Sequence, residues 1–464
     1  MPISPESGEQ MPISLTEREL QIPAVPGHHQ LLRHVSQLLD QHLDGGKFPL
    51  RAVITASDER FYHCEVGTLA GLDRRLDSSI FEFVLRQVES TDSFNAVLLV
   101  PTGIGAEIGG HAGDATPVAA LLASVCDTLI THPNVVNASD VIDIPSNSLY
   151  VEGSVISRLL MGAVGLQRVR RNRLLVVLGS HDDDLFINAA INSVNAARSS
   201  YGLICPRIVQ LDSRLVMGSH YTSSGRAAGD VTGVESLFEV LDQYAGEYDA
   251  VAITSQISVP QNYHQDYFDS GGNMVNPWGG VEAILTHAVS TLYNVPSAHS
   301  PMLETQEIAN ADPGVVDPRM AAEAVSLALL QCILKGLQKS PKIISDPAAL
   351  RHPGVLTAED ISCLVIPDGC IGLPTLAALE QGIPVIAVRE NKNLMRNDLS
   401  QLPWSQGQFF LVENYWEAAG VMAAMQAGID PKAVRRPLQP AMVEKQAGGY
   451  SGILEALAAP LRPV

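Results

Sequence analysis

The chain has 464 residues, of which 46% are hydrophobic and 17% charged, enough apolar material for two or three domains at about 100–200 residues each. The net charge of -20 and the pI near 5.0 argue against a nucleic-acid partner, because little positive charge is present to attract phosphate backbones. No apolar run reaches the roughly 18–20 residues of a membrane span, and the N-terminus lacks a signal-peptide pattern, so the sequence predicts a cytoplasmic protein.

The first part of the chain, residues 1–26, is predicted to be a disordered tail, in which the tetrapeptide MPIS occurs twice. Residues 27–93 follow as a small α+β lead-in. Within it, HQLLRHVSQLLDQHL and SIFEFVLRQV (residues 79–88) have apolar residues at helical spacing. RAVITA and RFYHCEV flank the turn-like SDE, which favours a hairpin.

After this lead-in, apolar runs of strand length alternate with helical segments, as in AVLLV, PVAALLASV and DTLIT. The alternation predicts an α/β fold with mostly parallel, Rossmann-like sheets and helices on both faces. A main α/β domain is expected over residues 94–338, and a second Rossmann-like portion with a helical C-terminus over 339–464. Long helices are expected at 279–293 and 318–337, whereas 260–280 is expected to be a long loop without regular structure.

Residues 101–117, PTGIGAEIGGHAGDATP, form a glycine-laced loop between a strand-like run and a helix-like run. Such loops meet ligands at the carboxyl ends of parallel strands, where glycine lets the backbone approach an anion closely. The spacing matches neither GxGxxG nor a P-loop, and a structural glycine turn is the alternative. The candidate ligand-binding residues are Gly103, Gly105, Gly109 and Gly110, with Asp114 as a candidate helix cap and catalytic carboxylate.

The next strand-like run leads into THPNVVNASD, residues 131–140. Asn134 and Asn137 are short polar side chains suited to bind a sugar or a carboxylate. An ordinary turn is an equal alternative, because asparagine bonds readily to its own backbone.

The densest polar cluster after a strand is SHDDD, within residues 174–200. His181, Asp183 and Asp184 stand at a strand-to-helix junction, where carboxylates are favoured by the helix dipole. There they can serve as a general base or hold a divalent metal. A helix cap without a catalytic role is the alternative.

This cluster resembles the HPDD motif of zinc-dependent N-acetylglucosamine deacetylases. The resemblance implies that His181 and Asp184 are metal ligands and that Asp183 is the base. Asp182 stands where that family has proline, and no HxxH motif follows in the chain.

Residues 366–388, IPDGCIGLPTLAALEQGIPVIAV, have the order strand, glycine turn, helix, strand. The segment is similar to the sugar-nucleotide segment of non-hydrolysing N-acetylglucosamine 2-epimerases and related glycosyltransferases, where glycine amides at a helix start meet a diphosphate. The resemblance implies ligand-binding roles for Gly369, Gly372 and Thr375.

Taken together, these stretches resemble an uncharacterised domain-of-unknown-function family of cyanobacteria and plants, over residues 94–398. The resemblance implies a cytosolic or plastid-stroma setting in a photosynthetic lineage, but it implies no activity.

The sequence favours an enzyme, a transferase, epimerase or hydrolase, that binds a small phosphorylated or nucleotide-linked metabolite in its glycine loops, with the aspartate cluster as a base or Mg²⁺ site. A metal-dependent amidohydrolase or deacetylase and a non-catalytic metabolite sensor or assembly factor stay open as alternatives. Mg²⁺ and Zn²⁺ are the candidate cofactors. The expected partner is a small anionic molecule, not nucleic acid or a membrane, and assembly into a homo-oligomer stays open.

Overall fold

The computed structural model describes residues 12–43, 46–72, 79–138, 144–326, 329–438, 440, 441 and 443. Their strands form a ten-stranded, a six-stranded and a three-stranded sheet, and helices pack against these sheets. This arrangement confirms the α/β class.

The six-stranded sheet is parallel throughout, and its apolar strands are buried, as expected for a parallel sheet. In sheet order the strands are β19 (Phe409–Val412), β18 (Val385–Val388), β16 (Ile361–Pro367), β4 (Asn95–Leu98), β5 (Thr128–Thr131) and β6 (Ser148–Tyr150). Strands from both sides of residue 338 therefore share one sheet. The chain proceeds outward from β4 in one direction and from β16 in the other, so these two central strands flank a topological switch point.

The ten-stranded sheet is mixed, so the expectation of mostly parallel sheets holds only in part. Its antiparallel portion has the order β17 (Ile371–Gly372), β2 (Lys47–Ser57), β3 (Phe61–Ala70), β1 (Ser14–Pro23), β11 (Ala227–Thr232) and β10 (Val216–Tyr221). Its parallel portion has the order β13 (Ser297–Met302), β12 (Ala250–Ser258), β8 (Arg173–Leu178) and β9 (Ile204–Gln210). The two portions join where the end of β12 pairs with β10. Short connections within the β2–β3 and β10–β11 hairpins produce the antiparallel pairing.

Strand β1 corrects the prediction of a disordered tail up to residue 26. It pairs along its whole length with β3, and its beginning also pairs with β11. The sequence SLTERELQIP shows little apolar alternation because Glu17, on the inner face, is buried in an ion-pair network instead of an apolar core.

Five of the helices pack around the two large sheets. Helix α8 (Gly279–Tyr293) contacts β11 and β13 of the ten-stranded sheet and also α4 (Gly153–Leu160), which packs with α13 (Leu373–Gln381) of the six-stranded sheet. Helix α5 (Asp184–Tyr201) packs with α11 (Leu330–Leu337). Helix α8 therefore lies at the junction of the two sheets.

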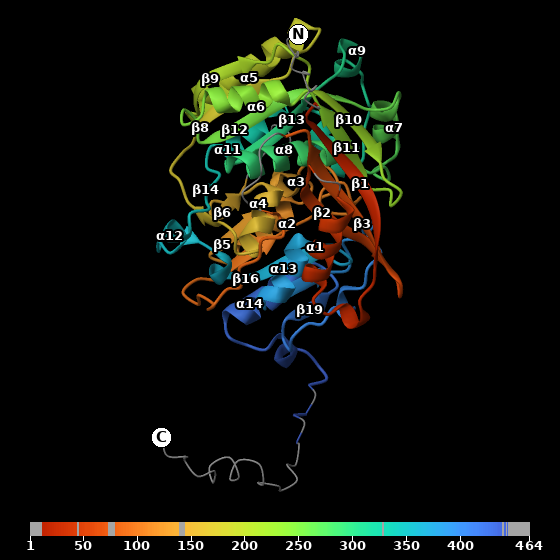
Figure 1. Ribbon diagram of the computed structural model, residues 1–464, viewed down its shortest axis with the longest axis vertical. Helices are drawn as coiled ribbons and strands as arrows, with labels where there is room; N and C mark the ends of the chain where they lie inside the picture. Colours follow the sequence, from red (N-terminus) through yellow and green to blue (C-terminus); the bar gives the residue numbers. More distant parts are fainter. Residues whose placement is uncertain are drawn as a thin grey trace, which may run out of the picture.

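Two further helices belong to the six-stranded sheet, α2 (Thr116–Ala123) and α14 (Tyr415–Gln426), and they contact each other. Helix α6 (Glu235–Gln243) belongs to the ten-stranded sheet. Figure 1 shows β16, α2, α13 and α14 in the lower half of the molecule, β8, β9, β12, α5 and α6 in the upper half, and α8 between them. One apolar cluster runs from the six-stranded sheet to α5 and α11, and a second lies between α6, α8 and the ten-stranded sheet.

Shorter elements complete the described chain. The three-stranded antiparallel sheet has the order β14 (Lys342–Ile344), β7 (Gly165–Gln167) and β15 (Val355–Leu356). The other helices are α1 (Leu31–His42), α3 (Pro133–Val136), α7 (Tyr263–Asp269), α9 (Gln306–Ala309), α10 (Ala321–Ala324), α12 (Pro347–Leu350) and the 3-10 turns η1 (Pro26–His28), η2 (Pro318–Met320), η3 (Ala358–Asp360), η4 (Leu399–Gln401) and η5 (Pro431–Val434). Among the described residues, no helix is long and apolar enough to cross a membrane.

Three local predictions differ from the structure. Residues 79–88 are not helical, because the Arg86 guanidinium and backbone are tied to the end of α13 through Gln381 and Gly382. The expected helix at 318–337 is divided into η2, α10 and α11, with two residues between the last two outside the described chain. The expected loop at 260–280 contains α7.

Candidate functional site

The switch point between β4 and β16 opens into a cavity. A crevice forms at such a point because the loops after the two strands depart in opposite directions. Pro101 and Thr102 follow β4, Gly372 and Thr375 follow β16, and all four line a cavity of about 120 Å³, here called the switch-point cavity. The sequence analysis assigned these two loops to ligand binding independently, and the fold brings them together.

A second cavity, of about 140 Å³, adjoins the first and is here called the central cavity. Four predicted ligand residues line it: Gly103, Gly110, Asn134 and Asn137. The two cavities share the lining residues Thr102, His132, Gly153, Ala283 and His287. They therefore lie next to each other, and together they are here called the cleft.

Several of the predicted residues hold the glycine loop in place. Asn134 donates through Nδ2 to the carbonyl oxygens of Val100 at 2.9 Å and Gly109 at 2.8 Å. Asp114 accepts from the backbone N–H of Gly109 at 2.8 Å, and burial raises the pKa of its carboxyl group to about 7. Asp114 is not among the residues that line the cleft. Its observed contacts are those of a residue that fixes the loop.

Among the predicted loop glycines with positive φ, Gly103 lines a cavity and the others only turn the chain. Gly103 lies so close to β11 that a Cβ atom would stand 2.6 Å from the Ala227 carbonyl oxygen, at a φ of +77°. Gly105, Gly109 and Gly369 also have positive φ but do not line the two cavities. Their role in the described structure is to turn the chain.

The start of α13 faces the switch-point cavity. Gly372 is the N-cap residue and has no side chain to bond the free N–H groups of the first turn. Thr375 does not supply that bond either, because its hydroxyl donates to the Cys370 carbonyl oxygen at 2.8 Å. A ligand can therefore accept from this helix end.

The aspartate cluster stands apart from the cleft. His181, Asp183 and Asp184 follow β8 at the start of α5, and none of them lines the two cavities. Asp183 caps the helix by accepting from the Leu185 N–H at 2.9 Å. That bond, followed by one from Gln306, holds its pKa below the usual value.

His181 is not free to bind a metal. Its Nε2 donates to the Leu303 carbonyl oxygen at 3.0 Å, and its Nδ1 accepts from the Asp183 N–H at 3.0 Å, so both ring nitrogens are already bonded. Within the described ranges, no group of three or more His, Cys, Asp or Glu side chains is arranged to hold a metal ion. The described residues therefore do not fit the zinc site that the resemblance to the HPDD motif implied.

Three residues that the sequence analysis did not select meet in the cleft: His132, Glu152 and His287. His132 follows β5, Glu152 caps α4, and His287 lies in the middle of α8. His287 Nδ1 is hydrogen-bonded to a Glu152 carboxylate oxygen. Two sequence patterns could have identified these residues. His132 and Glu152 are polar residues that follow strands, and His287 is a histidine within an apolar helix.

Glu152 is ionised and His132 is neutral in this cluster. Burial opposes ionisation of Glu152, but His287 and the hydrogen bonds from Ser154 outweigh it and hold the pKa of the carboxyl group below its usual value. Burial lowers the pKa of His132 to about 4. Because the Val100 N–H donates to His132 Nε2 at 3.1 Å, the ring proton lies on Nδ1. The cleft thus contains a carboxylate, an imidazole bound to it and a neutral imidazole.

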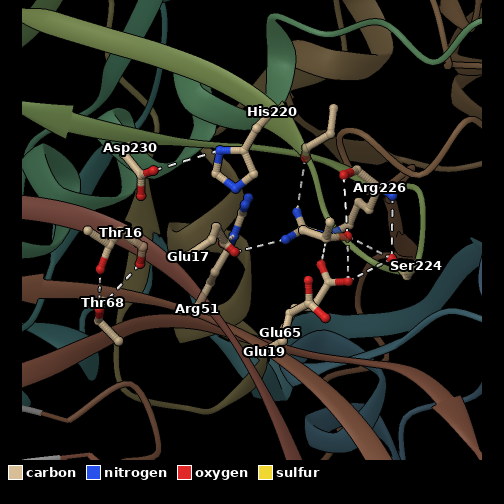
Figure 2. Close-up of polar contacts among 12 residues, drawn as sticks. Thr16, Glu17, Glu19, Arg51, Glu65, Thr68, His220, Ser224, Arg226 and Asp230 are labelled. Atoms are coloured by element: carbon tan, nitrogen blue, oxygen red, sulfur yellow. Dashed lines mark hydrogen bonds and ion pairs between the residues drawn. The ribbon is translucent and has the colours of Figure 1, made fainter.

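A buried network of two arginines and two glutamates adjoins the switch-point cavity, which its arginines, Arg51 and Arg226, line, and Figure 2 shows these side chains turned toward one another. Arg226 bonds Glu17 at 2.8 Å and Glu65 at 2.5 Å, and Arg51 Nε bonds Glu17 at 2.5 Å. Burial raises the pKa of the Glu17 carboxyl group, but the two guanidinium groups outweigh it and hold that pKa low. Two guanidinium groups thus face two carboxyl groups, and the formal charges of the network balance.

One atom of this network is left without a partner. Arg51 Nη2 is buried and makes no hydrogen bond, although the Arg51 side chain lines the switch-point cavity. A buried guanidinium N–H without an acceptor is costly, and an anionic ligand is the acceptor that suits it best.

A third cavity, of about 550 Å³, continues from the central cavity and is here called the apolar cavity. The two share Ala112, Asn137, Asn276, Glu282 and His299. His299 is held on both sides, by Ser255 Oγ at 2.9 Å and by a Glu282 carboxylate oxygen at 3.0 Å. The cleft thus extends from β4 and β16 to the ends of β12 and β13.

This fold and cleft define an α/β protein with a ligand-sized cleft at the carboxyl ends of parallel strands. Residues 95–435 match the family described as a protein of unknown function, DUF3326, and the chain belongs to this family. An uncharacterized lipoprotein of a Synechococcus strain is 32% identical over 351 residues, which cover 74% of this chain and 93% of the relative. No solved structure matches the chain. The resemblance to an uncharacterised family with cyanobacterial members is confirmed.

Proposed function

We propose that the cleft formed by the switch-point and central cavities binds a small anionic metabolite and catalyses a reaction on it by proton transfer. The observation that carries the proposal is the state of Arg51, whose buried Nη2 lacks a hydrogen-bond partner and whose side chain lines the same cavity as the start of α13. The ligand class is a phosphorylated, nucleotide-linked or carboxylate compound.

Two sources of positive potential support the anion. The free N–H groups and the dipole of α13 favour negative charge at its N-terminus, and Gly372 leaves room for a ligand oxygen to approach. Arg51 adds a charged donor from the opposite sheet, and a charge-assisted hydrogen bond is stronger than one between neutral groups. Glu17, Glu65 and Arg226 fix the position of the Arg51 guanidinium before the ligand arrives.

The adjoining histidines support a chemical role. When His287 donates a hydrogen bond from Nδ1–H to the Glu152 carboxylate, Nε2 is left as the basic nitrogen, as in other histidine–carboxylate pairs. His132 offers an Nδ1–H donor from the other side of the cleft. One group can therefore accept a proton while the other stabilises negative charge, which is what a transferase, epimerase or hydrolase of a small anion requires.

This proposal moves the base from the aspartate cluster to His287. Asp183 remains a candidate only if a ligand displaces Gln306 from its carboxylate. The cleft, by contrast, contains an imidazole whose basic nitrogen can meet a ligand without breaking a helix cap.

The binding half of the proposal is tested with Arg51→Lys, which keeps the positive charge for Glu17 but removes Nη2. Inorganic phosphate, pyrophosphate and a nucleoside diphosphate are titrated by calorimetry. At least one should bind the wild type, and the variant should bind it about tenfold or more weakly, as expected for the loss of a hydrogen bond to a charged group. Arg33→Lys, on the exposed side of α1, is the matched control and should bind like the wild type. Equal binding by wild type and Arg51→Lys would contradict the proposal.

The same proposal includes the cellular setting. We propose a cytoplasmic protein that needs neither nucleic acid nor a membrane as a partner and that can self-associate. The Synechococcus relative carries the name lipoprotein, so fractionation of cells is the relevant measurement. Recovery of the native chain in the membrane fraction would contradict the cytoplasmic setting and leave the cleft unaffected.

A further inference from the structure

We propose that the apolar cavity receives a hydrocarbon group of the same ligand whose anionic group binds beside Arg51, so that the substrate class is an amphipathic anion. The inference rests on the proposed function and adds the chemical nature of the ligand's other end. Four properties of the apolar cavity support it: its volume, its lining residues, their charges, and the residues that it shares with the central cavity.

The cavity has the size and lining of a site for an apolar group. Its volume of about 550 Å³ falls within the range of roughly 300–1,000 Å³ that is usual for ligand pockets. Apolar side chains from separate segments face it: Phe268 of α7, Trp278 before α8, Met302 of β13, Ile308 of α9 and Ile333 of α11. Burial of hydrocarbon against such a wall is favourable by about 25 cal/mol for each Å² removed from water.

The charges that line the cavity determine which end of the ligand enters it. Glu282, Glu304 and Glu323 contribute carboxyl groups to the wall, and none of the described residues that line the cavity is a lysine or an arginine. Burial raises the pKa of Glu304 and Glu323, and the wall offers no cationic side chain to an anion, whereas Arg51 and the start of α13 attract one at the other end of the cleft. The ligand is therefore oriented with its apolar group toward α7, α9 and α11.

Two buried polar atoms in this cavity have no partner. Ser300 Oγ lies on a residue that is 2% exposed, and His264 Nε2 belongs to a ring whose pKa is lowered by burial, so that the ring is neutral. Both side chains line the cavity. Buried polar groups are rarely left unsatisfied, and an oxygen atom of the ligand, such as that of an ester, amide or hydroxyl group, would satisfy one of them.

The three cavities place the reacting part of the ligand between its two ends. The central cavity, which contains His132, Glu152 and His287, shares residues with both the switch-point cavity and the apolar cavity. A ligand held at both ends would therefore pass its central atoms along these three side chains.

The test uses straight-chain alkyl phosphates of increasing length, titrated into the wild-type protein below their micelle concentrations. Affinity should stay level until the chain is long enough to reach the apolar cavity and then rise by about fourfold for each further methylene group. Ala311→Trp fills the cavity from its exposed rim and should remove this rise, while inorganic phosphate binds unchanged. Ala348→Trp, exposed on α12 and outside the cavity, is the matched control and should keep the rise.

The outcomes separate this inference from the proposed function. Binding of phosphate that is weakened by Arg51→Lys, without any increase along the alkyl series, would overturn the apolar site and leave the anion site standing. A rise with chain length that Ala311→Trp leaves intact would overturn it as well. A rise that Ala311→Trp removes but Arg51→Lys does not affect would support the apolar site and contradict the anion site.

Discussion

The molecule has two switch points in its parallel strands, one between β4 and β16 and the other between β8 and β12, and they differ in what their loops do. At the first, both loops open on a cavity lined by Arg51, whose Nη2 is buried and has no hydrogen-bond partner. At the second, residues after β12 line the apolar cavity, whereas the loop after β8 is held by hydrogen bonds within itself and to the Leu303 carbonyl oxygen.

The difference is caused by the side chains and not by the topology. Gly179, at the end of β8, lies so close to β12 that a Cβ atom would be 2.6 Å from that of Ser255, and Asp183 satisfies the start of α5. At the end of β16, Gly372 has no side chain that could cap the start of α13. The topology of a switch point thus makes a ligand site possible, and buried polar groups without a hydrogen-bond partner indicate at which switch point a ligand binds.

The largest expected effect is on turnover and comes from the first switch point. His287→Asn keeps a hydrogen-bonding group near Glu152 but removes the basic nitrogen, so turnover should fall by about 10²–10⁴-fold with little change in binding of the anion. The measurement compares consumption of candidate metabolites by wild type and variant. His181→Asn at the second switch point is the control and should leave turnover near the wild-type value. The reverse pattern would show that the aspartate cluster is the catalytic site. If the wild type binds the anion but consumes no metabolite, and His287→Asn only weakens that binding, the protein is a sensor.

The fold class and both glycine loops could be predicted from the sequence, because apolar runs and glycine clusters are local patterns. The cluster of His132, Glu152 and His287 could not, since its members come from three segments that only the tertiary structure brings together. The SHDDD stretch is the opposite case. Its polar residues are adjacent in the sequence and suggested a catalytic or metal site, but the contacts of these side chains in the structure do not support one. Strand β1 and residues 79–88 show long-range pairing overriding local preference.

The next effect in size is on stability and concerns the wall of the switch-point cavity. Arg226→Met removes the shared partner of Glu17 and Glu65 and leaves buried negative charge, so the free energy of unfolding should fall by about 3–5 kcal/mol. Urea denaturation followed by circular dichroism measures the loss. Arg435→Met breaks an exposed pair with Glu417 and should cost only about 0–1 kcal/mol. Equal losses of unfolding free energy in the two variants would mean that the buried network does not stabilise the wall of the switch-point cavity.

A third effect is a dependence of stability on pH that comes from His132. Its folded pKa of about 4 lies below the ordinary value of about 6.5, so between these pH values the unfolded chain binds more protons than the folded one. This residue therefore contributes stability above pH 6.5, on the order of 3 kcal/mol, that is lost as pH falls toward 4.

The measurement for His132 is the difference in unfolding free energy between wild type and His132→Gln, taken across pH 4 to 7. The difference is needed because Asp114 and Glu323, with pKa values raised by burial to about 7, give a slope of the opposite sign in both proteins. A constant difference across this range would contradict a buried, neutral His132.

The smallest expected effect belongs to the second switch point. Asp183→Ala removes the cap of α5 and should lower the melting temperature slightly, by less than Arg226→Met does, because the capping bond from the Leu185 N–H is exposed to solvent. Phosphate affinity, measured by calorimetry, should stay within about twofold of the wild type, since Asp183 does not line the cleft. A large loss of affinity would place the anion at this helix instead.

The most direct test of the cleft is a crystal structure of the protein grown with pyrophosphate. The anion should lie in the switch-point cavity, with one oxygen about 3 Å from Arg51 Nη2 and another facing the first N–H groups of α13. The contradicting result is a pyrophosphate bound at the start of α5 beside Asp183, with the Arg51 guanidinium left without a ligand.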